Sequence, residues 1–397
     1  MQGQLIRAVK EVEPGIKSIF DPFVGSGTTM TEAMMQGFDF VGQDINPLAI
    51  LICRAKMGPF DVQILQDKLN NLIYAIKEDQ NSQIVIDFPG RDKWFQPKIA
   101  VELSKIRRAI RIESELWCRR FFWVALAETV RLSSNSRTST FKLHIREEDD
   151  LERREREISP LIIFMEVASR NLENLSKQKS KLEENDLLER DNYRGCIEIN
   201  LGDSAINTGQ NTKELDLLIT SPPYGDNVST VPYGQHSFLP LQWIDLNDID
   251  EAMDNNWLKT TYEIDARSLG GIRKEALEDT IELKNVSKSF GQFLDELKGE
   301  PRDRSVRVAA FCRDLNRCIE PILAVLKPNA YMIWTVGNRH VAGRPVPVDQ
   351  ILVELLSSRG VSLVTKLERT IPIKRMALKN KIASTMRAET ILVLRKG

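Results

Sequence analysis

Residues 16–45 alternate between strand-like and helix-like segments around a glycine-containing turn, and this feature constrains the fold more than any other. Residues 16–23 (IKSIFDPF) have the apolar character of a buried strand, residues 28–38 (TTMTEAMMQGF) the pattern of a helix, and residues 39–45 (DFVGQDI) that of a second strand. A strand, a helix and a second strand in this order predict a βαβ unit with parallel strands.

The same alternation returns in the second half of the chain. Strands are predicted at residues 195–203, 215–224, 329–338, 362–373 and 388–397, and helices at residues 307–327 and 346–360. Strands that alternate with helices favour a mainly parallel sheet with helices on both faces. The sequence therefore predicts an α/β fold, a doubly wound, Rossmann-like sheet.

Two segments interrupt this pattern and divide the chain. With 397 residues, the protein exceeds the usual size of one domain, which indicates a core enlarged by insertions. The expected division is residues 1–59 as the first part of the core, 60–190 as a mainly helical insertion, 191–224 as core strands, 225–305 as a candidate recognition insertion, and 306–397 as the remainder of the core.

Charge and composition exclude some classes of protein. The 55 basic and 56 acidic side chains give a net charge of -1, so a nucleic-acid surface must arise from local asymmetry. No apolar run has the length of a membrane span, and the N-terminus lacks the pattern of a secretion signal, which predicts a cytoplasmic location. The five cysteines form no CxxC pair, and His144 and His340 have no partners at ligand spacing, so no metal is expected.

A candidate cofactor turn follows the first predicted strand. Gly25 and Gly27 permit a tight turn and a close approach of a ligand to the backbone, and Asp21 is suited to meet the positive amino-acid end of a cofactor. Asp44 ends the second strand, where an acidic side chain can accept hydrogen bonds from ribose hydroxyls. An ordinary turn at the glycines and a helix cap at Asp44, ahead of Asn46, are the alternatives.

A second candidate turn, Ser221-Pro222-Pro223-Tyr224, follows the buried strand at residues 215–219. Two consecutive prolines remove amide donors and leave a stiff loop of acceptors. The Ser221 hydroxyl and the Pro222 carbonyl could accept both N–H groups of an exocyclic amine, and Tyr224 could stack on a base that has left the duplex. A rigid surface turn with one buried tyrosine is the alternative.

DPFVGSGTT followed by SPPY is a specific pair, and with it the chain resembles the amino-methyltransferase superfamily. SPPY is typical of its cytosine-N4 branch. The resemblance continues through Gly202-Asp203-Ser204, Gly337-Asn338-Arg339, residues 225–244 after SPPY and the closing residues 371–396, which are similar to bacterial restriction-modification cytosine-N4 methylases. It covers roughly half of the chain.

The resemblance implies a function and a site. The implied enzyme transfers a methyl group from S-adenosyl-L-methionine to N4 of a flipped cytosine in double-stranded DNA, inside a bacterium or archaeon. The implied catalytic residues are Ser221, Pro222, Pro223 and Tyr224. The implied cofactor-binding residues are Asp21, Pro22, Phe23, Gly25, Ser26, Gly27, Thr28, Asp44, Ile45, Asp203 and Ser204. Family members commonly carry an aromatic cofactor motif before the first helix; here an extended N-terminus or a partner chain is expected to supply it.

Other activities compete with this interpretation. A cytosine-C5 methylase needs a Pro-Cys nucleophile, and no cysteine here follows a proline. Adenine-N6 methylation uses the same amine chemistry, usually with Asp or Asn at the position of Ser221. An RNA base methylase and a non-catalytic cofactor-binding subunit also stay open.

Candidate DNA contacts lie in both insertions. Arg131, Arg137 and Lys142 stand among small hydroxyl residues, a composition able to bind phosphates, although a solvated loop is an equal alternative. Residues 146–157 mix both charges and predict an exposed helix or linker. His236 could line a target pocket, as could Trp243, for which packing in the core is the preferred interpretation.

Overall fold

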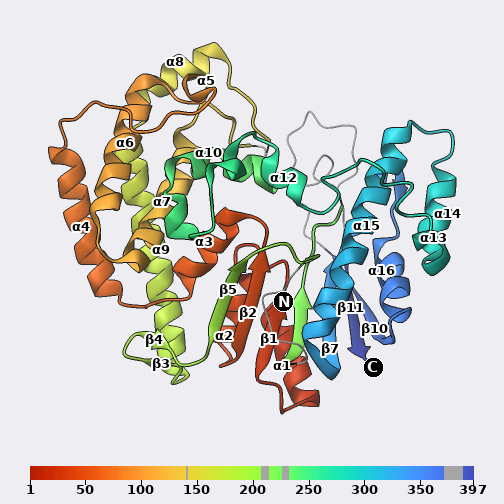
Figure 1. Ribbon diagram of the computed structural model, residues 1–397. Coiled ribbons are helices and arrows are strands. Elements are labelled where there is room, and N and C mark those ends of the chain that lie inside the picture. Colours follow the sequence, from red (N-terminus) through yellow and green to blue (C-terminus); the bar gives the residue numbers. More distant parts are fainter. Residues whose placement is uncertain (140–141, 207–213, 226–231, 371–387) are drawn as a thin grey trace.

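A seven-stranded sheet forms the centre of the protein in a computed structural model that describes residues 1–139, 142–206, 214–225, 232–370 and 388–397 (Figure 1). The strand order is β10-β11-β7-β6-β1-β2-β5. The strands are β1 (Ser18–Asp21), β2 (Asp39–Asp44), β5 (Ile197–Leu201), β6 (Leu215–Thr220), β7 (Leu326–Val336), β10 (Val361–Thr370) and β11 (Ala388–Lys396). The predicted doubly wound, mainly parallel sheet is confirmed.

The order of the strands reverses at β1. β1 pairs in parallel with β2 on one side and with β6 on the other, so the loops after β1 and β6 leave the same carboxyl edge in different directions. Such a switch point is where doubly wound sheets bind ligands. β11 lies antiparallel between β7 and β10, which brings its first residues to that same edge.

Alternate strand residues face two separate cores because both faces of the sheet are covered. Ile19 and Leu217 belong to the core beneath α1 (Gln2–Val12), α2 (Thr28–Met34) and α3 (Pro47–Lys56). Phe20 and Leu218 belong to the core beneath α15 (Arg302–Val325) and α16 (Val348–Ser357). All four side chains are fully buried, which explains the continuous apolar runs in the sequence.

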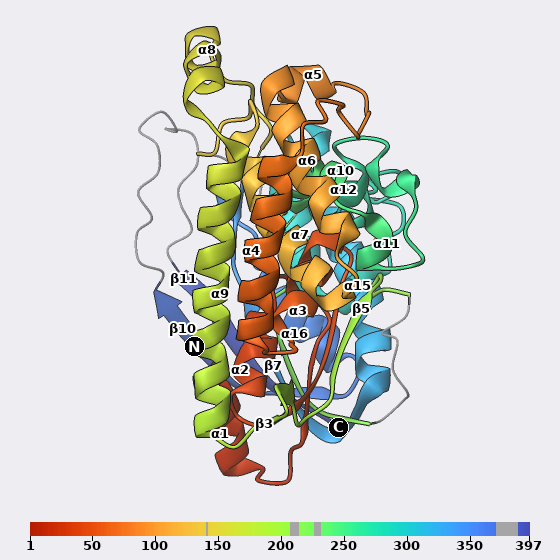
Figure 2. The ribbon, with the colours of Figure 1, turned by 90° about the vertical axis from the view of Figure 1, so that its left-hand side faces the viewer.

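The segment between β2 and β5 builds a helical layer beside the sheet (Figures 1 and 2). α7 occupies its centre, and the fully buried side chains of Phe122, Trp123 and Leu126 lie on this helix. α7 packs on α9 and on the core helix α3, while α8 buries no residue and forms an exposed helix. The helices are α4 (Val62–Glu78), α5 (Arg91–Trp94), α6 (Pro97–Ile112), α7 (Leu116–Ser133), α8 (Glu148–Glu157) and α9 (Pro160–Glu184).

The segment after β6 contacts both the helical layer and the core. α10 packs on α7, and Asp248 accepts a bidentate pair of bonds from Arg119, both at 2.8 Å, and a bond from the Trp123 indole at 2.7 Å. At its other end, α14 packs on α16. The elements are α10 (Tyr233–Trp243), α11 (Leu246–Ile249), η1 (Asn255–Leu258), α12 (Glu263–Arg267), α13 (Leu283–Val286) and α14 (Lys288–Glu296).

Some features differ from the sequence-based expectation or fall outside it. Two short hairpins were not predicted, β3 (Leu188–Glu189) with β4 (Asn192–Tyr193), and β8 (His340–Val341) with β9 (Arg344–Pro345). Of the stretches that carried the family resemblance, residues 226–231 and 371–387 lie outside the described residues. Within the described ranges, no helix has the length and apolarity needed to cross a membrane.

Candidate active site

The glycine loop, residues 21–27, connects β1 to α2 and is shaped by two left-handed residues. Gly25 has φ 51° and Gly27 has φ 79°, a region where other residues are strained. A Cβ on Gly27 would lie 2.9 Å from Sγ of Cys53, so the loop approaches α3 as closely as glycine permits. The Cys53 thiol donates to the Gly25 carbonyl at 3.3 Å, and burial raises its pKa, which makes it a structural thiol.

Asp44 holds the glycine loop from the end of β2. Its Oδ2 accepts from the Gly25 amide at 2.9 Å, and its Oδ1 accepts from the Asn46 amide at 2.8 Å. Burial raises the pKa of Asp44, and these amide bonds oppose the increase. The helix-cap alternative for Asp44 is wrong, because the Asn46 side chain caps α3 by accepting from the Leu48 amide. A carboxylate has about four lone-pair positions, so Asp44 retains capacity for a hydroxyl donor.

Asp21 joins the two candidate motifs. Its side chain is 3% exposed, and its Oδ1 accepts from the Phe23 amide at 3.1 Å and from Oγ1 of Thr220, the last residue of β6, at 2.7 Å. Burial raises the pKa of Asp21 to about 6, while the hydrogen bonds from Thr220 and Thr29 lower it. A cation brought next to this carboxyl would stabilise its ionised form.

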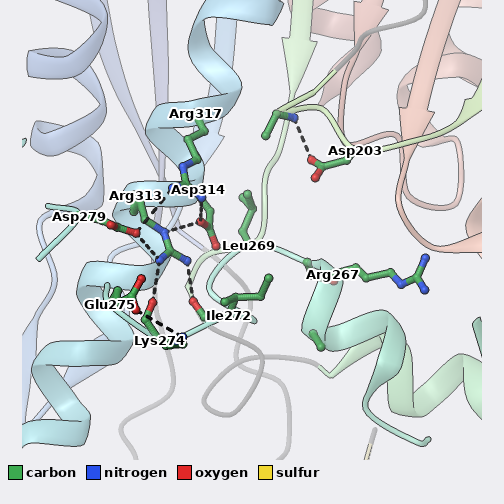
Figure 3. A pocket seen from close by; sticks show the side chains of 13 residues that line it. Asp203, Arg267, Leu269, Ile272, Lys274, Glu275, Asp279, Arg313, Asp314 and Arg317 are labelled. Carbon is green, nitrogen blue, oxygen red and sulfur yellow. Dashed lines mark hydrogen bonds and ion pairs between the residues drawn. The ribbon is translucent and has the colours of Figure 1, made fainter. Parts of the chain in front are cut away.

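A cavity adjoins Asp203, which lies in the loop after β5. It has a volume of about 300 Å³, with apolar lining from Ala205, Leu269 and Ile272 (Figure 3). Opposite stands Arg313 of α15, paired with Asp279 at 3.0 Å and with Asp314 at 2.9 Å. Arg317 lies 3.6 Å from Asp279 and 3.7 Å from Asp314, so two cations balance the two carboxylates. The cavity therefore offers a ligand at Asp203 both space and an apolar wall. Asp203 itself accepts from the Ala205 amide at 2.9 Å.

Other members of the predicted cofactor set lie around the glycine loop. The buried hydroxyl of Ser204 donates to the Pro22 carbonyl at 2.6 Å, which joins the loop after β5 to the loop after β1. Lys56 donates to the Ser26 carbonyl at 2.7 Å. The side chains at the following positions are partly or fully exposed: Phe23, Ser26, Thr28 and Ile45.

The proline loop, residues 221–224, is held by a chain of side-chain contacts. The Ser221 and Tyr224 hydroxyl oxygens lie 3.2 Å apart, and the Tyr224 hydroxyl donates to Oε1 of Glu389 at 2.8 Å. Burial raises the pKa of Tyr224, and Glu389 adds to the increase while Ser221 opposes it. Ser221 and Tyr224 are half-buried, and side-chain hydrogen bonds connect them to β11. The proline loop therefore differs from a simple surface turn.

Glu389 is the site residue that the sequence analysis did not find. It stands near the start of β11, and Arg369 lies directly opposite it on β10, with the guanidinium 3.3 Å from Oε2. The only local signal is an acidic residue at the second position of the strand predicted at residues 388–397. Arg339 also closes on the proline loop, because a Cβ on the adjacent Gly225 would lie 2.2 Å from its Cδ.

The three predicted phosphate-binding residues gather around one histidine, which lies on α10. Arg131, Arg137, Lys142 and His236, which we call the basic pocket, line a small hollow of about 20 Å³. Burial lowers the pKa of His236, and Arg131 lowers it further. Trp243 is fully buried and packs edge-on against Phe95, with the two ring centroids 5.3 Å apart, which confirms its packing role.

Part of the positive charge of the basic pocket is already balanced. Arg131 pairs with Glu128 at 2.7 Å, and Arg137 pairs with Glu147. Phosphates at this surface would therefore compete with carboxylates for the guanidinium groups. Across the described ranges, no group of three or more His, Cys, Asp or Glu side chains is arranged to hold a metal ion.

Comparison with known proteins gives two informative matches. The chain is 33% identical to the type II methyltransferase M.MvaI of Kocuria varians over 423 residues, covering 99% of this chain and 87% of that protein. It is 40% identical to the type II methyltransferase M.MjaII of Methanocaldococcus jannaschii over 60 residues, covering 15% of this chain and 11% of that protein. No protein-family model matches the chain.

Proposed function

The chain belongs to the type II methyltransferases, and on that premise we propose that it methylates the exocyclic N4 of cytosine in double-stranded DNA within a restriction-modification system. The observation that carries this proposal is the Thr220–Asp21 hydrogen bond of 2.7 Å, which fixes the proline loop beside the glycine loop. A methyl donor held by one loop would thus lie next to acceptors on the other. We place this reaction in the cytoplasm of a bacterial or archaeal host.

The residues at the edge fit S-adenosylmethionine, which when bound supplies an electrophilic methyl group on a sulfonium. Gly25 leaves open space where a Cβ would lie, with only the Phe23 carbonyl oxygen at 4.0 Å, so a ligand can approach the backbone there. Carboxylates stand at the carboxyl ends of three neighbouring strands: Asp21 ends β1, Asp44 ends β2, and Asp203 lies two residues after β5. In the proposal, Asp21 faces the ammonium of the cofactor, Asp44 its ribose hydroxyls, and Asp203 its adenine beside the cavity. The remaining members of the binding set are Pro22, Phe23, Gly25, Ser26, Thr28, Ile45 and Ser204.

The proline loop would bind the amine of the target base. The lone pair of an exocyclic amine is delocalised into the ring, so the nitrogen is a poor nucleophile until its geometry changes. Ser221 Oγ and the Pro222 carbonyl would accept its two N–H groups and favour a tetrahedral nitrogen, while Pro223 keeps the loop stiff. Tyr224 would stack on the base once it has left the duplex. The neutral hydroxyl of Ser221 favours cytosine N4 over adenine N6.

The DNA duplex would lie against the segment after the proline loop. Residues 225–305 carry α10, and α10 brings His236 to the basic pocket, where three cationic side chains come from the helical insertion. Such side chains contact phosphates and set the register of the protein on DNA. Residues 225–305 are therefore our candidate target-recognition region.

Nucleoside analysis tests the proposed target. Duplex DNA incubated with the protein and S-adenosylmethionine is digested to nucleosides and analysed by mass spectrometry, with the Ser221→Ala protein as the control. We expect N4-methylcytosine from the wild-type protein alone. N6-methyladenine without N4-methylcytosine would overturn the choice of base, methylation of RNA alone would overturn the DNA substrate, and no product with any nucleic acid would favour a non-catalytic subunit.

A further inference from the structure

We propose that Glu389 fixes the direction of a hydrogen-bond relay through Tyr224 to Ser221, and that this relay leaves Ser221 able only to accept hydrogen bonds from substrate. The inference rests on the proposed function of Ser221 as an acceptor for the target amine. It adds a positioning residue on β11, outside both sequence motifs, and gives a reason why the site selects an amino group.

The direction of the relay follows from counting protons. Glu389 is paired with Arg369, and an ionised carboxylate has no proton to donate, so the 2.8 Å contact with Tyr224 must be donated by the phenol. A phenol carries one O–H, and this contact uses it. In the 3.2 Å contact between Ser221 and Tyr224, the serine must then be the donor.

This direction determines what Ser221 presents to a base. A serine hydroxyl has one proton and two lone pairs, and the relay uses the proton. Both lone pairs of Oγ remain available to an incoming group, which must itself be a donor. An exocyclic amine meets this requirement, whereas an unprotonated ring nitrogen or a carbonyl oxygen does not. A reversed relay would turn the Ser221 proton toward the amine and oppose its binding.

The sheet holds Glu389 in position for this role. Because β11 runs antiparallel to β7, its first residues reach the edge where β6 ends. The Glu389 side chain is 15% exposed, and its cross-strand partner Arg369 is 45% exposed. The partly buried carboxylate therefore has a fixed cationic partner on one oxygen and the phenol on the other, an arrangement that favours a strong charge-assisted hydrogen bond.

A double-mutant cycle separates the relay from a merely structural contact. Glu389→Ala should lower the single-turnover rate of methyl transfer about 10- to 100-fold, with cofactor affinity and base capture close to wild type. Tyr224→Phe, which keeps the ring but lacks the hydroxyl, should cause a similar loss. The double variant should be no slower than Tyr224→Phe alone, because either change already breaks the relay.

Two further variants guard against misfolding. Glu389→Gln retains an acceptor oxygen and should recover much of the rate that Glu389→Ala loses. Glu368→Ala removes an exposed carboxylate from β10 beside Arg369 and should match wild type. Independent, multiplicative losses in the double variant would overturn the relay, as would a loss of base capture equal to the loss of rate, which is the signature of a structural contact.

A spectroscopic measurement tests the relay without using activity. In protein labelled with ¹³C at Cζ of tyrosine, the Tyr224 resonance is identified by its disappearance in Tyr224→Phe. We expect Glu389→Ala to shift this resonance and Glu368→Ala to leave it unchanged. An unmoved resonance in Glu389→Ala would overturn the relay, whatever base the enzyme methylates. A shifted resonance in a protein that makes no N4-methylcytosine would keep the relay and overturn the proposed function.

Discussion

The glycine loop and the proline loop end beside each other at the sheet edge, but the protein holds them by different means. In the glycine loop, carboxylates of Asp21 and Asp44 accept backbone amides. In the proline loop, Pro222 and Pro223 have no amide proton, and side chains of Ser221, Tyr224 and Glu389 provide the contacts. The first loop is shaped through its backbone, whereas the second depends on individual side chains. Substitutions in the two loops should therefore fail in different ways.

The largest effect should come from the proline loop. Ser221→Ala removes an acceptor that matters mainly in the transition state, so we expect turnover to fall about 100- to 1000-fold while cofactor affinity stays close to wild type. Steady-state kinetics and calorimetric titration of S-adenosylmethionine measure the two quantities. Equal losses of rate and cofactor affinity would assign Ser221 to the cofactor side and remove the contrast between the loops.

Tyr224→Ala should give the next largest effect, again without loss of cofactor affinity. Stacking of a base on an aromatic ring contributes about 1 to 3 kcal/mol, so capture of the flipped base should weaken by a corresponding factor. Fluorescence of 2-aminopurine at the target position measures this capture. Tyr224→Phe keeps the ring and is the matched control; if it weakened capture as much as Tyr224→Ala, the stacking role would be wrong.

The glycine loop should instead respond to pH. Burial raises the pKa of Asp21 to about 6, so the carboxyl protonates below that pH. In the protein alone, the raised pKa means that the contribution of this carboxyl to stability is fully present below its ordinary pKa of 3.8 and is lost as pH rises through about 6. A bound ammonium would favour the ionised form, so cofactor affinity should rise up to about tenfold per pH unit as pH approaches 6 and then level off.

Calorimetric titrations of S-adenosylmethionine from about pH 5 to about pH 8, a range that brackets the Asp21 pKa of about 6, measure this affinity. Asp21→Asn keeps an acceptor for Thr220 but cannot ionise, so its affinity should be lower and should vary less with pH. A flat profile for the wild-type protein, or the same slope in Asp21→Asn, would separate Asp21 from the cofactor ammonium.

The smallest effect should arise outside both loops, in the basic pocket. Arg137→Ala should weaken DNA binding similarly for all sequences and reduce the slope of log affinity against log salt concentration by about 1. Fluorescence anisotropy at several salt concentrations measures this slope. Arg153 of α8, whose side chain is 61% exposed, offers a matched control. If Arg153→Ala had the same effect, general charge and not the basic pocket would account for the binding.

Local patterns made most of the core predictable. β1 and β6 could be predicted because both of their faces are buried, which makes their sequences continuously apolar. The helices between the strands could be predicted from the spacing of their apolar residues. The carboxyl ends of parallel strands meet at one edge, so the sequence also indicated that Asp21, Asp44 and Ser221 lie on the same side of the molecule. In the structure, Asp21 and Asp44 end the neighbouring strands β1 and β2, and Ser221 directly follows β6 on the other side of β1.

Contacts between distant segments could not be predicted in the same way. Glu389 reaches Tyr224 only because β11 enters the sheet antiparallel between β7 and β10, and no spacing between motifs records that direction. The sequence likewise left open whether Asp44 is a helix cap, since Asp is a common capping residue, whereas the structure gives this role to Asn46. His236 and Arg131 share a pocket because α10 packs on α7, a contact with no local signature.

The hydrogen bond from Thr220 to Asp21 joins positions 199 residues apart, and this separation affects how the protein folds. Contacts between distant positions form slowly, because the entropy of closing the loop is lost before the contact stabilises the chain. The helices of residues 62–184 pack largely on one another and can form before the sheet is complete. Once these helices have formed, the flexible chain between the two loops is shorter, and the glycine loop and the proline loop should meet sooner during refolding than their sequence separation alone would allow.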